Sequence, residues 1–183
     1  MRKAVLGMAV AAVLVTDCSG DTESLEQELA DMTAERDVLA AQVAADASRY
    51  EKTKATIGAV TALIADPTAH GTETEFLDQI MVYYAPGAVM DDAALGAAAM
   101  REAWSNTLFG DVDADIKTWH TWISDDGSNG GSLWTWSGTN LVGEPFELIG
   151  ISVMSYNDEG LQTYQLVTYP YDHEYVAETF LGI

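Results

Sequence analysis

The sequence predicts an α+β fold in which helices come first and a curved antiparallel sheet follows. Before Asp115, apolar residues recur at spacings of three and four, which is typical of amphipathic helices. After Asp115 the period changes to two, and four segments rich in aromatic and β-branched residues follow. A chain of 183 residues has room for one such domain and an accessory segment.

The composition indicates a packed domain with an acidic surface. Apolar residues make up 48% of the chain, which is enough for a core. There are 8 Lys and Arg residues against 29 Asp and Glu, a net charge of −21. Such a chain repels nucleic acid and anionic headgroups, so we expect no nucleic-acid partner. No Lys or Arg follows Lys117, which argues against phosphorylated ligands in the C-terminal half.

The first twenty residues, MRKAVLGMAVAAVLVTDCSG, have the order of an export signal. Two basic residues precede an apolar run of about 12 residues, which is too short to span a bilayer. The sole cysteine, Cys18, follows this run, and its position resembles a bacterial lipoprotein signal, although Asp17 stands where that family has a small residue. The resemblance implies removal of residues 1–17, a lipid anchor at Cys18 and a place in the bacterial cell envelope. Plain secretion and a retained membrane anchor are the alternatives.

Residues 18–53 are predicted to form a helical stalk. The segment DTESLEQELADMTAERDVLAAQVAADASRY has no Gly or Pro, and the helix is expected to continue from about Thr22 to Ala65, where Asp66–Pro67 ends it. Its apolar residues recur at heptad spacing, which resembles a short coiled coil. Either the stalk pairs two copies and lifts the domain from a membrane, or it folds back on its own domain. The heptad positions are Leu25, Leu29, Met32, Leu39, Val43 and Tyr50, and the same frame continues through Ile57, Val60 and Ile64.

Two more helices are predicted within residues 54–183. Thr72 and Glu75 have the spacing of a capping box, which would open a helix over EFLDQIMVYYA. A short strand, AVMDD, follows the break at Pro86–Gly87. The third helix, AAAMREAWSNTLFG, has its large apolar residues in register: Met100, Trp104 and Leu108.

Four longer strands are predicted in the C-terminal half. They are IKTWHTWIS, SLWTWSG, FELIGISVMSY and LQTYQLVTYPY, and DDGSNGG and NDEG are hairpin turns between them. Both faces carry apolar residues, since Val167 and Tyr169 alternate with Tyr164 and Leu166. We therefore expect the helices to cover one face and a second subunit to cover the other.

This order of elements resembles the nuclear transport factor 2-like superfamily, particularly its SnoaL-like polyketide-cyclase and ketosteroid-isomerase branches. The resemblance covers about Lys54 to Ile183 and is carried by YYAPGAVMDD, GAAAMREAWSNTL, GGSLWTWSG, YNDEGLQTYQLVTYPYD and the final FLG. It implies a cone-shaped sheet packed on about three helices around an apolar pocket. Members include isomerases, cyclases, dehydratases and non-catalytic binders, so the fold leaves the reaction open.

Three residues are candidate acid/base groups by this resemblance. Asp92 matches the catalytic aspartate of ketosteroid isomerase-like members, which works best with a pKa raised by an apolar pocket. Only one of Asp91 and Asp92 can line a pocket, because adjacent strand residues point to opposite faces. His120 corresponds to a histidine that some dehydratases use, and strict alternation places it on the face of Thr118. Asp172 corresponds to an acid/base of SnoaL-like cyclases. Each candidate also has a purely structural interpretation.

Aromatic side chains are the strongest indication of a ligand. Rings with polar tips suit a flat apolar molecule, although they suit core packing equally. The three histidines lack metal-ligand spacing, so we expect neither metal nor cofactor. The leading hypothesis is binding of a small apolar or aromatic molecule without catalysis; an isomerase, cyclase or dehydratase and an envelope scaffold acting through the stalk are the alternatives. The candidate ligand-binding residues are Tyr84, Trp104, Trp119, Trp122, Trp134, Trp136, Glu147, Tyr164 and Tyr169.

Overall fold

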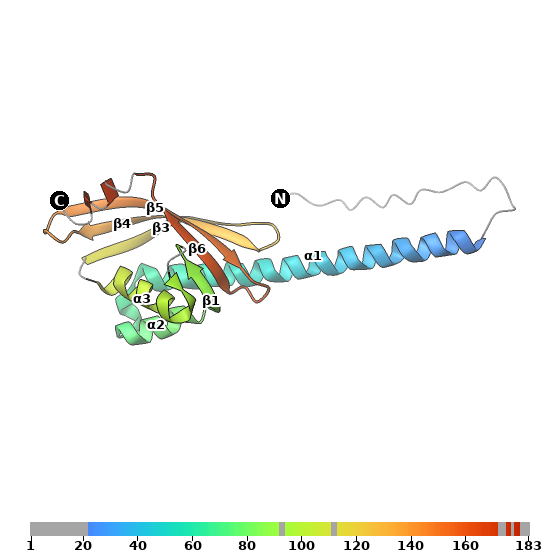
Figure 1. Ribbon diagram of the computed structural model, residues 1–183, viewed down its shortest axis with the longest axis horizontal. Coiled ribbons are helices and arrows are strands. Elements are labelled where there is room, and N and C mark those ends of the chain that lie inside the picture. The colour runs from blue at the N-terminus through green and yellow to red at the C-terminus, as the bar shows by residue number, and fades with distance from the viewer. Residues whose placement is uncertain (1–21, 92–93, 111–112, 172–174, 177, 180–183) are drawn as a thin grey trace. The chain divides into compact units, whose positions relative to one another are not determined.

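A computed structural model describes residues 22–91, 94–110, 113–171, 175–176 and 178–179 (Figure 1). The chain divides into two compact units, Met1–Ala40 and Ala41–Ile183, and the division falls within the first helix. The helices are α1 (Thr22–Ala65), the short 3-10 helix η1 (Pro67–His70), α2 (Glu73–Met81) and α3 (Gly96–Phe109). The strands are β1 (Tyr84–Met90), β2 (Ala94–Leu95), β3 (Asp113–Ile123), β4 (Asn129–Thr139), β5 (Pro145–Tyr156) and β6 (Gln162–Thr168).

The strands form one curved sheet in the order β2-β1-β6-β5-β4-β3 (Figure 1). The predicted α+β fold is confirmed, and the hairpins β3–β4, β4–β5 and β5–β6 are antiparallel as expected. The sheet is mixed rather than purely antiparallel, because β1 pairs with β6 in parallel. The sequence pattern reveals which segments are strands but contains no direct signal for this pairing of distant strands.

The helix boundaries agree with the sequence signals at most positions. Helix α1 spans Thr22–Ala65 as predicted, and the Thr72–Glu75 capping box at the start of α2 is formed. The predicted extension of α2 over Tyr83 and Tyr84 is wrong, because α2 ends at Met81 and Tyr84 begins β1. Pro86 disfavours helical geometry at Ala85, the residue before it, and Tyr84 pairs with Gln162 at the start of β6.

The larger core lies between the helices and the sheet. Figure 1 shows α2 and α3 on the same side of the sheet. The C-terminal part of α1 contributes Val60 and Leu63 to this core. Phe76 and Ile80 of α2 and Met100 of α3 are fully buried in it. One face of the sheet is therefore covered by helices, as the two-sided apolar pattern predicts.

Two hairpin turns hold α1 against the sheet. The hydroxyl of Thr53 donates to the Gly127 carbonyl at 2.8 Å, and that of Thr56 donates to the Gly160 carbonyl at 2.8 Å. Both glycines have positive φ, and a Cβ atom at either position would lie 2.6 Å or less from an atom of α1. We call these contacts the turn clamp; Arg49 adds to it by donating to the Asp126 carbonyl at 2.8 Å.

The heptad positions of α1 from Leu25 to Val43 are exposed in this single chain, whereas Tyr50 is half-buried and Ile57 is buried against the domain. Leu25, Leu29 and Met32 are 61 to 66% exposed, and coiled-coil pairing remains a prediction. No helix in the described residues has a stretch long and apolar enough to cross a membrane. The predicted signal and Cys18 fall outside the described residues.

Candidate ligand-binding cavity

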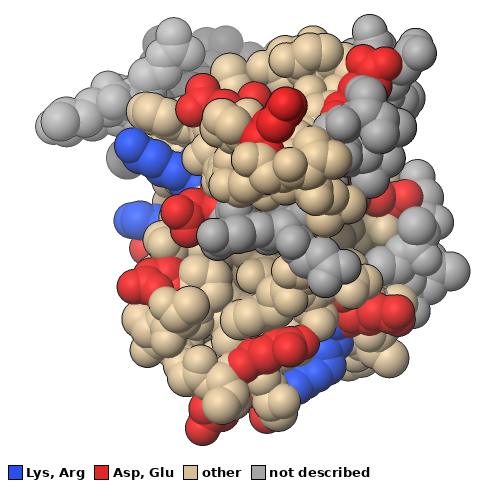
Figure 2. Space-filling model, turned by 90° about the vertical axis from the view of Figure 1, so that its left-hand side faces the viewer, with Lys and Arg blue, Asp and Glu red and all other residues tan. Residues whose placement is uncertain are grey.

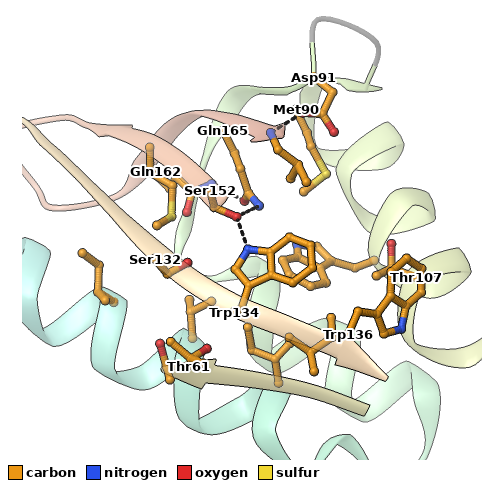
Figure 3. A pocket seen from close by; sticks show the side chains of 18 of the residues that line it. Thr61, Met90, Asp91, Thr107, Ser132, Trp134, Trp136, Ser152, Gln162 and Gln165 are labelled. Carbon is orange, nitrogen blue, oxygen red and sulfur yellow. Dashed lines mark hydrogen bonds between the residues drawn. The ribbon is translucent and has the colours of Figure 1, made fainter. Parts of the chain in front are cut away.

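A cavity of about 140 Å³ lies between the helices and the inner face of the sheet. Helix α1 lines it with Ile57, Val60, Thr61 and Ile64, and α3 with Trp104 and Thr107. The sheet supplies the remaining walls, mostly through residues of β3 to β6 (Figure 3). This volume is of the order of engineered apolar cavities that hold one aromatic ring, and it is smaller than typical drug-sized pockets.

Trp134 forms the central wall of the cavity (Figure 3). Its partner across the β4–β5 ladder is Gly150, and a Cβ atom there would lie 2.2 Å from Cη2 of the indole. The missing side chain therefore lets the ring lie against β5. Tyr169 packs edge-on against it with ring centroids 5.7 Å apart.

A chain of hydrogen bonds crosses this wall. Trp134 Nε1 donates to Ser152 Oγ at 2.9 Å, and Gln165 Nε2 reaches the same oxygen at 3.5 Å (Figure 3). Gln162 Nε2 donates to Gln165 Oε1 at 2.8 Å. At the other end Trp104 Nε1 donates to the Tyr84 hydroxyl at 2.9 Å, and Gln162 also hydrogen-bonds that hydroxyl. Burial raises the pKa of Tyr84 well above its usual range, so the phenol stays neutral.

Asp91 is the one charged side chain among the described residues that line the cavity. It has a φ of 53°, and its Oδ1 accepts from the Val167 backbone N–H at 2.5 Å. Burial raises the pKa of Tyr169, and the Asp91 carboxylate adds to this effect. The carboxylate is exposed, so it lies at the rim rather than inside. No Lys, Arg or His occurs among the described lining residues.

Four of the nine predicted ligand-binding residues line the cavity. These are Trp104, Trp134, Trp136 and Tyr169. Tyr84 is buried behind the wall, where it accepts the hydrogen bond from Trp104. The other four do not line the cavity: Trp119, Trp122, Glu147 and Tyr164.

A β-bulge explains why strand β3 departs from the alternation expected of it. The register with β4 shifts between Thr118 and His120, so Trp119 is skipped in the ladder. Thr118 lines the cavity, whereas His120 is exposed, pairs with Leu133 and stacks on Trp122 with ring centroids 6.5 Å apart. The prediction that His120 shares a face with Thr118 is therefore wrong. The extra residue reverses the phase for the rest of the strand.

The other two candidate acid/base residues, Asp92 and Asp172, fall outside the described residues. Asp91 is the member of the acidic pair that the structure places at the cavity. No group of three or more metal-ligating side chains occurs within the described part of the chain.

The polar residues of the cavity are absent from the sequence-based candidates. Ser132, Ser152, Gln162 and Gln165 all line it. A signal was present for Ser152, because alternation in β5 puts it in phase with the buried residues Leu148 and Met154. A polar residue in an otherwise apolar phase indicates either a partner in the core or a ligand.

Comparisons with known proteins give a likeness of fold. No family model matches the sequence, and no curated protein is similar to it. The structure of TerC co-crystallised with polyporic acid has a TM-score of 0.55 and 16% identity, covering 70% of this chain and 98% of TerC. A nuclear transport factor 2-like protein of unknown function from Exiguobacterium sp. has a TM-score of 0.52 and 16% identity, covering 64% and 99% of the two chains. The Δ5-3-ketosteroid isomerase from Mycobacterium sp. has a TM-score of 0.50 and 15% identity, covering 64% and 92%.

These structures share the arrangement of a curved sheet over helices, and at such identities the likeness concerns the fold alone. The chain has the nuclear transport factor 2-like α+β fold.

Proposed function

We propose that the domain binds a small, largely apolar molecule in the cavity and has no reaction of its own. The main support for the proposal is the cavity of about 140 Å³, which has three of the five tryptophans in its walls. Indole rings offer flat apolar contact area, and the few polar groups beside them can orient a ligand. The similar structure of TerC was determined with polyporic acid, which supports a small-molecule role.

Catalysis is the second candidate, and it rests on the likeness to the ketosteroid isomerase structure. The residues proposed for an isomerase, cyclase or dehydratase are Asp92, His120 and Asp172. Among them His120 is exposed and does not line the cavity. Turnover in a substrate screen that Asp92→Asn or Asp172→Asn abolishes would favour the enzyme over the binder.

We also propose that the protein forms a homodimer, which pairs through the sheet and the stalk. The face of the sheet opposite the helices carries exposed apolar side chains, with Trp119 at 60%, Val153 at 43% and Ile149 at 40%. Such a patch on an isolated chain is typical of an interaction surface. Sedimentation analysis tests this, and we expect Val153→Glu to weaken association while Thr74→Glu, at an exposed position of α2, leaves it unchanged.

The remaining part of the proposal is the location. The order of the first twenty residues supports export and a lipid anchor at Cys18 in the bacterial cell envelope. An envelope scaffold acting through the stalk is the alternative role for such an anchored chain.

Native mass spectrometry of the full-length protein, extracted from membranes, tests these points together. We expect a small mass that is lost on denaturation, a dimer, and an acyl adduct on a chain that starts at Cys18. A native mass per protomer that equals the mass of the denatured chain would contradict a bound ligand. A chain without an acyl group would contradict the anchor and leave the binding role to be judged separately.

A further inference from the structure

The hydrogen-bond chain in the cavity wall has a donor group at both of its ends. It runs from the Trp104 indole through Tyr84, Gln162, Gln165 and Ser152 to the Trp134 indole. An indole N–H can only donate, whereas an amide accepts at its oxygen and donates at its nitrogen. Because both ends donate inward, the direction of the chain has to reverse at one of its hydroxyl groups.

The reversal falls at Ser152. Its Oγ accepts from Trp134 and from Gln165, which occupies both lone pairs. Its own hydroxyl hydrogen has no acceptor among the described residues, and the residue lines the cavity. Reversing both glutamine amides would move the surplus hydrogen to Tyr84, which is 5% exposed and does not line the cavity. The cavity is therefore where the unused donor can be satisfied, by water or by a ligand.

The charge of the site decides which acceptor fits. Asp91 is the sole charged side chain of the described lining, so an entering anion would lose its hydration without gaining a cation and would meet a carboxylate at the rim. Figure 2 shows the same imbalance on one face of the molecule, where acidic side chains are spread over the surface and basic ones are few. A carboxylate ligand is thus disfavoured, whereas the oxygen of a ketone, ester or amide is compatible with the site.

We infer that the cavity selects an uncharged molecule of about one ring whose oxygen accepts a hydrogen bond from the Ser152 hydroxyl. This rests on the proposed binding function and specifies its ligand class. The cavity volume of about 140 Å³ sets the size. Ser152 would then be a residue that determines specificity, through the one hydrogen bond that its hydroxyl donates to the ligand.

Three probes of nearly equal shape test the inference on the full-length protein. Acetophenone carries the acceptor, α-methylstyrene replaces its oxygen by a CH₂ group, and benzoate adds a negative charge. Binding is followed by the ¹H–¹⁵N signal of the Trp134 indole in wild type, in Ser152→Ala and in Ser155→Ala. Ser155 lies on the same strand three residues later and does not line the cavity, which makes it a matched control.

We expect wild type to bind acetophenone more tightly than α-methylstyrene, and Ser152→Ala to reduce that preference about three- to tenfold by loss of one hydrogen bond. Ser155→Ala should keep the wild-type preference, and benzoate should bind at least about tenfold more weakly than acetophenone because its charge stays uncompensated. Retained binding of α-methylstyrene by Ser152→Ala verifies that the variant is folded with its cavity intact.

Two results overturn the inference while the binding function stands. One is equal preference in wild type and Ser152→Ala, and the other is binding of benzoate at least as tight as that of acetophenone. If neither acetophenone nor α-methylstyrene binds to wild type, the proposed function itself fails and the inference fails with it. The α-methylstyrene titration therefore separates the two failures.

Discussion

Replacing Gly150 by alanine tests whether the Trp134 ring is positioned as described. A Cβ atom at position 150 would lie 2.2 Å from Cη2 of Trp134 and 2.3 Å from Cζ2. Ordinary van der Waals contact begins at about 3.4 Å, so the ring has to retreat by about 1.2 Å, the difference between 3.4 and 2.2 Å. The Trp134 side chain is 7% exposed, and its Nε1 donates a hydrogen bond to Ser152. Moving the ring therefore lowers the stability of the folded domain.

The expected loss of stability combines two effects. Overpacking a well-packed site costs about 1–3 kcal/mol. Weakening the hydrogen bond between Trp134 and Ser152 costs about 1 kcal/mol more, which gives a loss of about 2–4 kcal/mol. The retreating ring also moves into the cavity, so affinity for α-methylstyrene should fall.

Urea unfolding followed by tryptophan fluorescence measures the stability, and the α-methylstyrene titration measures the cavity. Gly87→Ala is the control, because a Cβ atom at that strand position meets nothing within 4 Å. It should stay within about 0.5 kcal/mol of wild type. If Gly150→Ala is as stable as wild type and binds the probe equally well, the close packing of Trp134 on β5 is refuted.

The contacts of α1 and its neighbouring turn give three more predictions. Thr53→Val removes the buried donor to the Gly127 carbonyl and should cost about 1–3 kcal/mol in urea unfolding; an unchanged midpoint would argue against the turn clamp. Gly58→Ala lies at an exposed helix position with open space and should stabilise by about 0.5–1 kcal/mol, so a measured loss would contradict the helix there. Hydrogen bonds, first from the Ser124 hydroxyl, lower the pKa of Asp126 to about 2. Because this lies below the unfolded value of about 3.9, its contribution to stability is present above about pH 4 and lost as the pH falls toward 2. Asp126→Asn should lack this part of the pH dependence, and a carboxyl pKa near 4 by NMR would contradict it.

Local signals in the sequence were sufficient for most of the fold. The capping box at Thr72 and Glu75 needs only residues three apart, and it forms as predicted. The four long strands follow from the change of period and from turn residues such as those at 157–160. These features depend on neighbours in the chain, which is why a single sequence reveals them.

The features that escaped prediction depend on distant partners. Thr53 interrupts the heptad pattern of α1, yet it is fully buried because a hairpin turn far along the chain accepts its hydrogen bond. The bulge at Trp119 reverses the side chains after it, and nothing in TWHTW marks the extra residue. The parallel pairing of β1 with β6 joins strands that are well separated in sequence.

The aromatic residues of the candidate site were predicted from the sequence, whereas its polar residues were not. Aromatic residues stand out in a sequence, and Trp134, Trp136 and Tyr169 are indeed placed around the cavity. Gln162 and Gln165 could not be recognised in this way, because a glutamine in a strand is normally predicted to be exposed. Both are buried here, and they form a hydrogen bond with each other. Ser152 does have a local signal, because it is a polar residue in the buried phase of its strand.

In the proposed function the tryptophan-lined cavity takes up a small apolar molecule. The most direct measurement is a titration of the ¹⁵N-labelled full-length protein with toluene, followed at the five indole N–H signals. Trp104, Trp134 and Trp136 line the cavity, whereas Trp119 and Trp122 do not and serve as internal controls. We predict saturable shifts for the first three signals and none for the other two. Shifts confined to Trp119 and Trp122, or no saturable shift at all, would contradict binding in this cavity.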